Sequence, residues 1–251
     1  MHQGLQVLTT EQKSERRPGH WGASFPYRVL AMKLLIANKN YSSWSLRAWL
    51  VLAHFDIEFE EELLLLNGQG WKENLVARSP TGNVPVLIDG DLAVPETLAI
   101  IEYIADLYPD KGVWPADRRD RALARSAASE MHAGFDALRS AAPMNLRASY
   151  PGRISRDVID ADIQRLETLL GGFLAKSGGP YLFGRFTAAD AMFAPVATRL
   201  RTYNISVSDT LTEYVEAIYA LPAFQAWLSD AVREPWIVEQ DELEIIQGKT
   251  N

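Results

Sequence analysis

The chain has 251 residues, of which 47% are hydrophobic and 23% charged, as in an ordinary globular protein with room for one large or two small domains. Its 25 basic and 32 acidic residues give a formal net charge of -7, which disfavours general attraction to nucleic acid or to an anionic membrane surface. No run of about eighteen apolar residues predicts a membrane-spanning helix. The absence of cysteine excludes disulfides, a CxxC redox pair, a thiolate nucleophile and cysteine-bound metal, so any thiol that takes part in chemistry must belong to a ligand.

The first part of the chain, residues 1–31, is predicted to be a disordered extension. It is polar and mixed in charge, contains Pro18-Gly19 and Pro26, and shows no sustained periodicity. A mitochondrial transit peptide is one alternative, although Glu11 and Glu15 count against it. The other is a start codon assigned too early, with Met32 as the working start.

Residues 32–108 alternate between strand and helix patterns. Short apolar runs predict strands, and apolar residues at helical spacing predict helices. The predicted strands are 33–37, 59–65, 86–88 and 92–94, and the predicted helices are 45–55, 71–77 and 96–107. Asp89-Gly90-Asp91 between two apolar runs is a strong hairpin signal, so the last two strands are antiparallel. The order β-α-β-α-β-β-α is the thioredoxin-like arrangement.

The second half of the chain is predicted to be an all-helical domain. Pro109, Gly112 and Pro115 mark residues 109–118 as a linker, after which strand patterns end. The domain covers 119–240 and a tail follows at 241–251, with helices expected at 119–139, 154–175, 191–200, 209–220 and 222–233. Thr187-Ala-Ala-Asp190 matches a capping box at the start of the third of these helices.

A thioredoxin-like domain followed by an all-helical domain resembles the soluble glutathione transferases, from about residue 33 to about residue 239. Four motifs in the same order carry this resemblance: Ser42-Ser-Trp-Ser-Leu-Arg47, Asn83-Val-Pro-Val-Leu87, Pro95-Glu-Thr-Leu-Ala-Ile100 and Thr187-Ala-Ala-Asp190. The first is similar to the Ser-Ser-Cys-Ser-x-Arg signature of the zeta class. Trp44 stands where that signature has cysteine, which weakens the transfer of the zeta class's own substrate to this chain.

The resemblance implies that the protein binds glutathione and stabilises its thiolate. Ser42 is the expected catalytic residue, because a hydroxyl just before a helix can donate a hydrogen bond to sulfur while the helix N-terminus supplies positive potential. Tyr41 and Ser43 are alternatives one position away. Without the other motifs, Ser42, Ser43 and Ser45 would be interpreted only as helix caps.

The same resemblance implies the rest of the glutathione site, namely Trp44, Trp71, Asn83, Val84, Pro85, Glu96 and Thr97. A cis Pro85 would let the Val84 backbone pair with the cysteinyl part of the ligand. Glu96 would accept from the γ-glutamyl ammonium, and Thr97 at a helix start would donate to the neighbouring carboxylate. Trp71, with Lys72, is expected near the glycyl end, and Trp44 either walls the sulfur pocket or belongs to the core.

The second substrate is expected between this site and the helical domain. Candidates for an apolar wall are Met131, Phe135, Met144 and Tyr203, and candidates for binding anionic groups are Arg139, Arg147, Arg199 and Arg201, although all could equally be core or surface residues. His54 and His132 show no triad or metal spacing and are interpreted as packing or surface residues.

These observations predict a cytoplasmic, homodimeric glutathione transferase that conjugates glutathione to a small electrophile, as in detoxification. No metal, nucleic acid or membrane is expected to take part. One alternative is a glutathione-dependent cis–trans isomerase of the maleylacetoacetate type, whose arginines would hold substrate carboxylates. Another is a non-catalytic glutathione-binding or interaction module on the same fold.

Overall fold

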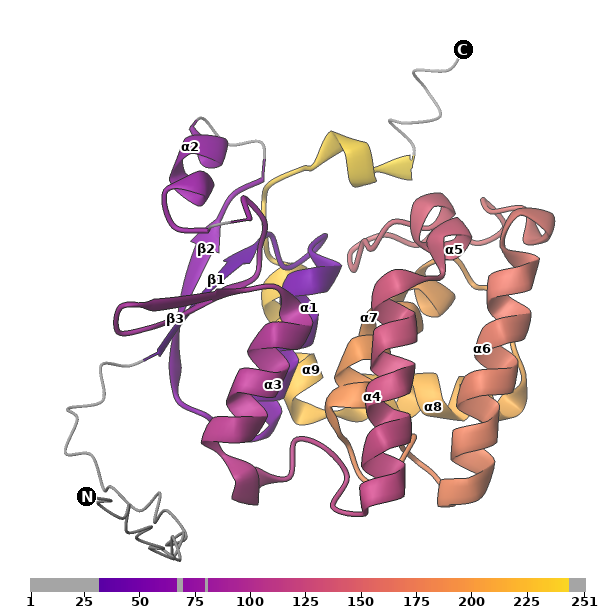
Figure 1. Ribbon diagram of the computed structural model, residues 1–251. Coiled ribbons are helices and arrows are strands. Elements are labelled where there is room, and N and C mark those ends of the chain that lie inside the picture. Colours follow the sequence, from indigo (N-terminus) through magenta and orange to yellow (C-terminus); the bar gives the residue numbers. More distant parts are fainter. Residues whose placement is uncertain (1–31, 67–69, 80, 244–251) are drawn as a thin grey trace, which may run out of the picture.

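Figure 1 shows the computed structural model, which describes residues 32–66, 70–79 and 81–243. The expectations for 1–31 and for most of the tail at 241–251 lie outside these residues. A small sheet with its helices forms one half of the molecule, and upright helices form the other (Figure 1). In the described ranges, no helix is both long and apolar enough to cross a bilayer.

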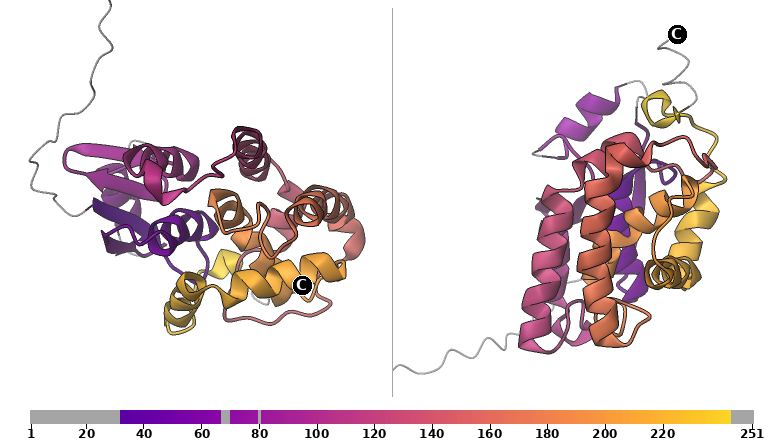
Figure 2. Two further views of the ribbon diagram at one scale, coloured as in Figure 1. Left: turned by 90° about the horizontal axis from the view of Figure 1, so that it is seen from below. Right: turned by 90° about the vertical axis from the view of Figure 1, so that its right-hand side faces the viewer.

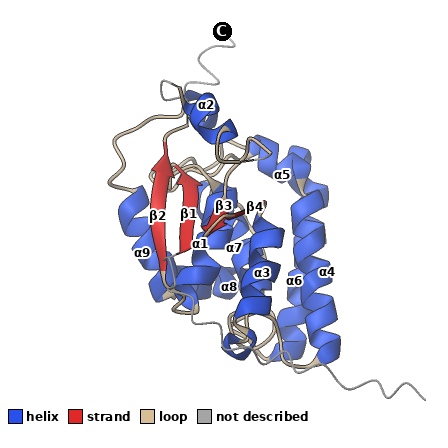
Figure 3. Ribbon diagram, turned by 60° about the vertical axis from the view of Figure 1, so that its left-hand side comes forward, coloured by secondary structure: helices blue, strands red, loops and turns tan. Residues whose placement is uncertain are grey.

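The sheet has four strands in the order β2-β1-β3-β4 (Figure 3). They are β1 (Met32–Ala37), β2 (Phe59–Leu64), β3 (Val86–Asp89) and β4 (Leu92–Pro95). β1 is parallel to β2 and antiparallel to β3, and its apolar run is wholly buried from Leu34 to Ala37 because it lies inside the sheet. The predicted hairpin is present, with Asp89 opposite Leu92 and Gly90 at a φ of 61°.

Three helices complete the first half: α1 (Ser43–His54), α2 (Trp71–Val76) and α3 (Thr97–Leu107). α1 packs against β1 and α3 on its own side and against the helical half on the other. α1 is therefore buried on almost every side. In contrast, α2 lies apart from α1 and α3, at the top of the sheet (Figure 1). The order of strands and helices is the thioredoxin-like one that the sequence predicts.

The second half contains α4 (Arg118–Ala133), α5 (Asp136–Ala141), α6 (Arg156–Ser177), α7 (Ala188–Thr202), α8 (Asp209–Ala220) and α9 (Pro222–Ala231). Short 3₁₀ turns lie at η1 (Pro109–Lys111) and η2 (Glu239–Asp241). α7 is almost entirely buried because α1, α4 and α8 all pack against it (Figure 2). After α9 the chain turns back toward the first half and runs past the N-terminal end of α1 (Figure 1).

The single helix predicted over 119–139 is wrong, because the structure breaks it between α4 and α5. Gly134 is extended, with a φ of −132°, and Phe135 adopts a left-handed φ of 60°. A Cβ at residue 134 would lie 3.1 Å from the Glu130 carbonyl oxygen, so glycine permits this bend. The bend buries the Phe135 ring edge-to-face against Phe193, and this burial outweighs helix continuity.

Candidate active site

A cavity of about 280 Å³ lies where the two halves of the molecule meet. Its walls come from the start of α1, the loop before β3, the start of α3 and the end of α4. The lining residues are Trp44, Thr81, Asn83, Val84, Glu96, Thr97 and His132. Five of the residues expected to bind glutathione are thus brought together from three separate segments.

The loop before β3 presents free backbone groups to the cavity. The Val84–Pro85 peptide bond is cis, and among the described residues nothing pairs with the N–H or C=O of Val84. Pro85 is not a lining residue, but its carbonyl accepts from the Glu96 N–H at 3.3 Å, which ties this loop to the start of α3. The Ser79 hydroxyl accepts from the Asn83 N–H and donates to the Asn83 carbonyl, so the loop is held from behind.

Glu96 holds a strained position at the start of α3. Its φ of 80° is uncommon for a residue other than glycine, and such conformations cluster at functional sites. One carboxylate oxygen caps α3 by accepting from the Leu98 and Ala99 N–H groups, at 3.0 and 3.3 Å. The other lies 3.0 Å from Nε2 of His132 on α4. The side chain is still 41% exposed, so part of the carboxylate remains open to a ligand.

Trp44 and Thr97 line the cavity and join α1 to α3. The Thr97 hydroxyl donates to the Trp44 carbonyl at 3.2 Å and the residue is almost wholly buried. In this structure the hydroxyl therefore joins the two helices. The Trp44 ring meets the His132 ring edge-on, with 5.1 Å between centroids, so Trp44 is part of the cavity wall.

Ser42 is the N-cap of α1 and is 9% exposed. Its hydroxyl lies 2.8 Å from the Ser45 hydroxyl and accepts weakly from the Ser45 N–H at 3.4 Å, while the Ser45 hydroxyl also accepts from the Ala37 N–H. Ser42 does not line the cavity, although Trp44 two residues later does. A hydroxyl can rotate its hydrogen, so this pair can be redirected toward a ligand without moving the backbone.

The two alternatives to Ser42 differ in their surroundings. The Tyr41 hydroxyl donates to Glu242 at 2.5 Å and accepts from Arg147 at 2.7 Å, so it is engaged with the helical half. Burial, followed by the Glu242 carboxylate, raises the pKa of Tyr41 and disfavours its ionised form. Ser43 is half-buried in the first turn of α1.

Several expected residues lie away from the cavity. Trp71 begins α2 and is outside the lining set. Five of the eight candidates for binding the second substrate are buried and lie outside the lining residues: Met131, Phe135, Met144, Arg199 and Tyr203 are at most 5% exposed. Their segments are packed together, with α4 against α7 and α5 against α6. Arg201 pairs with Glu216 on the surface, and Arg147 binds carbonyls of the C-terminal segment.

Thr81 and His132 are cavity residues that the sequence did not predict. Thr81 lies two residues before Asn83, where the Asn83-Val-Pro motif that predicted part of the glutathione site begins. His132 follows the buried Met131 on α4, and its role depends on how closely α4 approaches the start of α3. His54 packs against Phe55 and Phe186 as expected, and burial lowers its pKa.

Three arginines gather behind Trp44. Arg47 and Arg139 lie 4.2 and 5.0 Å from the centroid of its ring. Arg47 is wholly buried and its Nε donates to the Met192 carbonyl, but Nη1 and Nη2 have no partner among the described residues. Burial lowers the pKa of Arg47, and the positive charges of Arg199 and Arg139 lower it further. Burial also lowers the pKa of Arg199 to about 10.

Across the described part of the chain, no three histidine or acidic side chains come together in a way that could hold a metal ion. The site offers instead backbone amides, a carboxylate, an imidazole and hydroxyls. These groups suit a small peptide-like ligand with charged ends.

Comparisons with known proteins agree with this geometry. Two family models match, one described as glutathione S-transferase, N-terminal domain, over residues 41–107 and one as glutathione S-transferase, C-terminal domain, over residues 116–229. A probable maleylacetoacetate isomerase of Caenorhabditis elegans is 28% identical over 191 residues, covering 73% of this chain and 86% of that protein. Glutathione S-transferase Z2 of Arabidopsis thaliana is 29% identical over 206 residues, covering 74% and 88%. The fold is similar to that of a glutathione transferase homologue from Burkholderia with bound glutathione, at a TM-score of 0.61 and 24% identity over 80% of this chain and 97% of that one.

Proposed function

Since the chain belongs to the glutathione S-transferase family through both of its domains and functions as a glutathione transferase, we propose how its residues bind glutathione and activate the thiol. One observation carries the proposal. The free backbone groups of Val84, the carboxylate of Glu96 and the start of α1 converge on one cavity.

Glutathione binds at three points in this proposal. The Val84 N–H and C=O pair with the cysteinyl backbone, as an added strand would. Glu96 accepts from the γ-glutamyl ammonium, and the N-terminal end of α3 at Thr97 favours the neighbouring carboxylate. His132 is placed to hold the Glu96 carboxylate in line with the ligand through their 3.0 Å contact.

Ser42 stabilises the thiolate. A free thiol has a pKa near 8.5, and lowering it by about 2 units requires roughly 2.7 kcal/mol of preference for the anion. The Ser42 hydroxyl donates to sulfur, and the N-terminal end of α1 adds positive potential. Ser45 supports this arrangement, because its hydroxyl can turn to donate to Ser42 while still accepting from the Ala37 N–H.

The second substrate is a small electrophile. The thiolate forms a sulfur–carbon bond, and either a leaving group departs with its electron pair or a double bond accepts a proton. We further propose a cytoplasmic homodimer with a role in detoxification, on the basis of the family resemblance. Light scattering during size exclusion should give twice the chain mass of 28.1 kDa.

Glutathione-agarose retention and turnover of an aryl halide test the proposal. Wild type should be retained and should conjugate the halide. Ser42→Ala should be retained but should conjugate slowly at neutral pH. A wild-type protein that is retained yet inactive on an aryl halide, an organic peroxide and maleylacetone would favour the non-catalytic module.

The arginines behind Trp44 favour a second candidate, a cis–trans isomerase of the maleylacetoacetate type. A buried guanidinium without an anionic partner is costly unless a ligand supplies the anion. Arg47 has two unpartnered nitrogens, and the charged partner of Arg139 within salt-bridge distance is Asp136, at 3.5 Å. Arg139 is the partly exposed member of this cluster, with 25% of its side chain accessible, so a substrate carboxylate would bind there and offset the buried positive charge. In such a reaction the thiolate adds to the double bond, the carbon–carbon bond rotates, and elimination returns glutathione unchanged.

Maleylacetone turnover in the presence of glutathione distinguishes the two candidates. An isomerase should convert maleylacetone without consuming glutathione, and Arg139→Gln should reduce that activity more than conjugation of an uncharged aryl halide. Equal effects of Arg139→Gln on both reactions would remove the support that the arginines give to the isomerase.

A further inference from the structure

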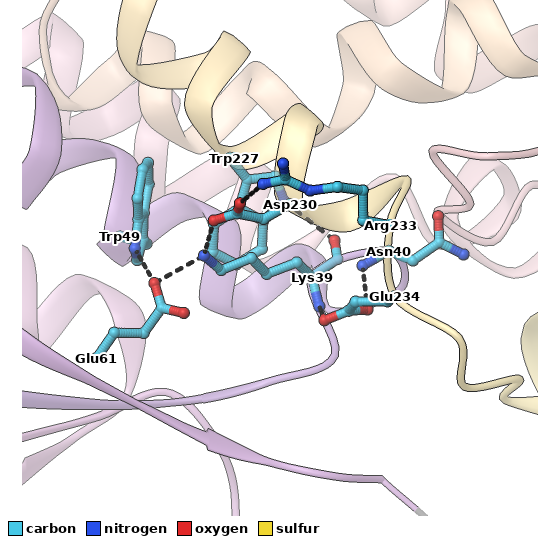
Figure 4. A network of polar contacts seen from close by, with 8 residues as sticks. All are labelled: Lys39, Asn40, Trp49, Glu61, Trp227, Asp230, Arg233 and Glu234. Carbon is cyan, nitrogen blue, oxygen red and sulfur yellow. Dashed lines mark hydrogen bonds and ion pairs between the residues drawn. The ribbon is translucent and has the colours of Figure 1, made fainter.

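The loop that leads to Ser42 is held by residues from the far end of the chain (Figure 4). Glu234, just after α9, accepts hydrogen bonds from two successive backbone N–H groups, those of Lys39 at 2.7 Å and Asn40 at 3.1 Å. Glu234 is only 8% exposed and lies outside the residues that line the cavity. A buried carboxylate that accepts from two adjacent amides fixes the peptide orientation between them.

Lys39 is enclosed by residues of α9, α1 and β2. Its carbonyl accepts from the Trp227 indole N–H at 3.0 Å. Its ammonium group lies 2.7 Å from the Asp230 carboxylate and 2.8 Å from the Glu61 carboxylate (Figure 4). The same group lies 5.2 Å from the centroid of the Trp49 ring and 5.3 Å from that of the Trp227 ring. Both the backbone and the side chain of this residue are therefore anchored.

The next two residues are anchored by the helical half as well. The Asn40 side-chain oxygen accepts from the Leu146 and Arg147 N–H groups, both at 2.9 Å. The Tyr41 hydroxyl binds Glu242. Ser42 follows directly, and its own N–H donates to the Asn38 carbonyl at 2.8 Å. Each loop residue from Lys39 to Tyr41 is thus fixed from outside its own domain.

We propose that Glu234 is a positioning residue for thiol activation, because it sets the backbone of the loop that presents Ser42 and the N-terminal end of α1. This inference rests on the proposed role of Ser42. Catalytic geometry is sensitive to such support, since a displacement of about 1 Å caused by a distant change can reduce a rate about a hundredfold. The glutathione contacts at Val84 and Glu96 lie on other segments and do not depend on Glu234.

A purely stabilising role for Glu234 makes a different prediction. If Glu234 only stabilises the fold, its substitution should lower the melting temperature and leave the pKa of the bound thiol unchanged. The pKa of the bound thiol, read from thiolate absorbance of the enzyme–glutathione complex, therefore separates the two roles.

The experiment compares the full-length wild type with Glu234→Gln, Ser42→Ala and the control Glu167→Gln. Glu167 also accepts from a backbone N–H and a hydroxyl, those of Ser208, and joins α6 to α8 away from the cavity. Glutamine keeps the shape of the side chain at position 234, but its NH₂ group faces either the Lys39 or the Asn40 N–H, where it cannot accept a hydrogen bond. Glu234→Gln should raise the thiol pKa by about half a unit to one unit and lower kcat at neutral pH about 1.5-fold to threefold, with KM for glutathione changed less than about twofold.

Glu167→Gln should change the melting temperature alone. If Glu234→Gln does not fold, Glu234→Asp keeps the charge but is too short to reach both amides, and a smaller shift in the same direction is expected. A folded variant at position 234 with wild-type thiol pKa and kcat would overturn the inference. If Glu234→Gln raises the thiol pKa while Ser42→Ala does not, the proposed role of Ser42 fails and Glu234 acts through the end of α1.

Discussion

Ser42 combines two uses of one hydroxyl. In the structure it caps α1 and pairs with Ser45, and in the proposed reaction it donates to sulfur. The two uses do not conflict, because capping uses an oxygen lone pair and thiolate stabilisation uses the hydrogen. When the Ser42 hydrogen turns toward sulfur, the Ser45 hydroxyl can donate to the Ser42 oxygen in its place.

Ser42→Ala should separate glutathione binding from activation. The pKa of the bound thiol should rise by about one unit or more, because the helix terminus remains and the hydrogen bond is lost. At neutral pH, kcat should fall several-fold to about tenfold and recover partly as the pH approaches about 9. Thiolate absorbance against pH measures this. If the bound thiol of Ser42→Ala has the wild-type pKa while that of Tyr41→Phe or Ser43→Ala is raised, the thiolate is stabilised by Tyr41 or Ser43 instead of Ser42.

Glu96→Ala should act through binding. Loss of a charge-assisted bond worth roughly 1.5–3 kcal/mol should raise KM for glutathione about tenfold to a hundredfold. The same change removes the cap of α3, so Asp117→Ala is a suitable control, because Asp117 caps α4 in the same way through the Arg119 and Asp120 N–H groups. The control should lose stability and keep its KM. An unchanged KM in folded Glu96→Ala would contradict the proposed contact.

His132→Gln should produce a smaller rise in KM than Glu96→Ala. Glutamine can still donate to the Glu96 carboxylate, but it does not reproduce the ring contact with Trp44. His132→Ala should then lie between the two. Initial rates at varied glutathione concentration measure all three variants, and an effect of His132→Ala on kcat alone would argue against a role in orienting Glu96.

The sequence could predict the cavity residues that lie in local motifs, but not those that depend on packing. Val84, Glu96 and Thr97 belong to a turn and a helix start whose patterns are visible over a few residues. His132 is 36 residues from Glu96, and nothing near it in sequence indicates their contact. Apolar spacing likewise could not tell whether Met131 and Tyr203 face a pocket or the core, since both arrangements use the same pattern.

At the scale of elements, the start of α7 is held by a buried carboxylate. Asp190 accepts from the Thr187 N–H and hydroxyl and from the Leu182 N–H, and it is wholly buried. Burial raises its pKa from 3.8 to about 6 despite these hydrogen bonds. The folded state therefore binds a proton more tightly than the unfolded state, and the contribution of Asp190 to stability falls as pH rises from about 4 to about 6.

Comparison with Asp190→Asn isolates this titration. The variant has no proton to bind there, so the difference in unfolding free energy between wild type and variant should be larger at pH 4 than at pH 7, by at most roughly 3 kcal/mol. Urea denaturation at a series of pH values measures it. The introduced amide also turns a donor toward the Thr187 N–H, so the variant should be less stable at every pH. A pH-independent difference would show that Asp190 does not titrate in this range.

Local patterns predicted most helices of the second domain and failed at one bend. The capping sequence at Thr187 and the Leu221-Pro222 break mark boundaries that the structure has. The bend at Phe135 has no such mark, because Gly134 is tolerated inside helices and a phenylalanine in a left-handed conformation is uncommon. Burial against Phe193, which comes from α7, decides the conformation there.

At the scale of the whole molecule, the first domain depends on the second for its own core. Trp49 of α1 packs edge-to-face on Trp227 of α9 at 5.3 Å, and the buried Arg47 donates to the Met192 carbonyl of α7 at 2.8 Å. Residues 32–112 expressed alone should therefore fail to fold cooperatively, because they would expose the α1 surface that α7 and α9 cover. Thermal melting followed by circular dichroism tests this, and a cooperative transition in the fragment would contradict it.

The bond between Lys39 and Glu234 joins residues 195 positions apart, and this imposes an order on biosynthesis. At about 5–20 residues per second, a ribosome takes roughly 10 to 40 s to reach Glu234 after it has made Lys39. During that interval the nascent chain already contains Ser42, Val84 and Glu96 but lacks the carboxylate that fixes the loop before α1. Nascent chains arrested before Glu234 should therefore activate the thiol less well than the finished chain, so the segment that follows α9 sets when the enzyme reaches full reactivity.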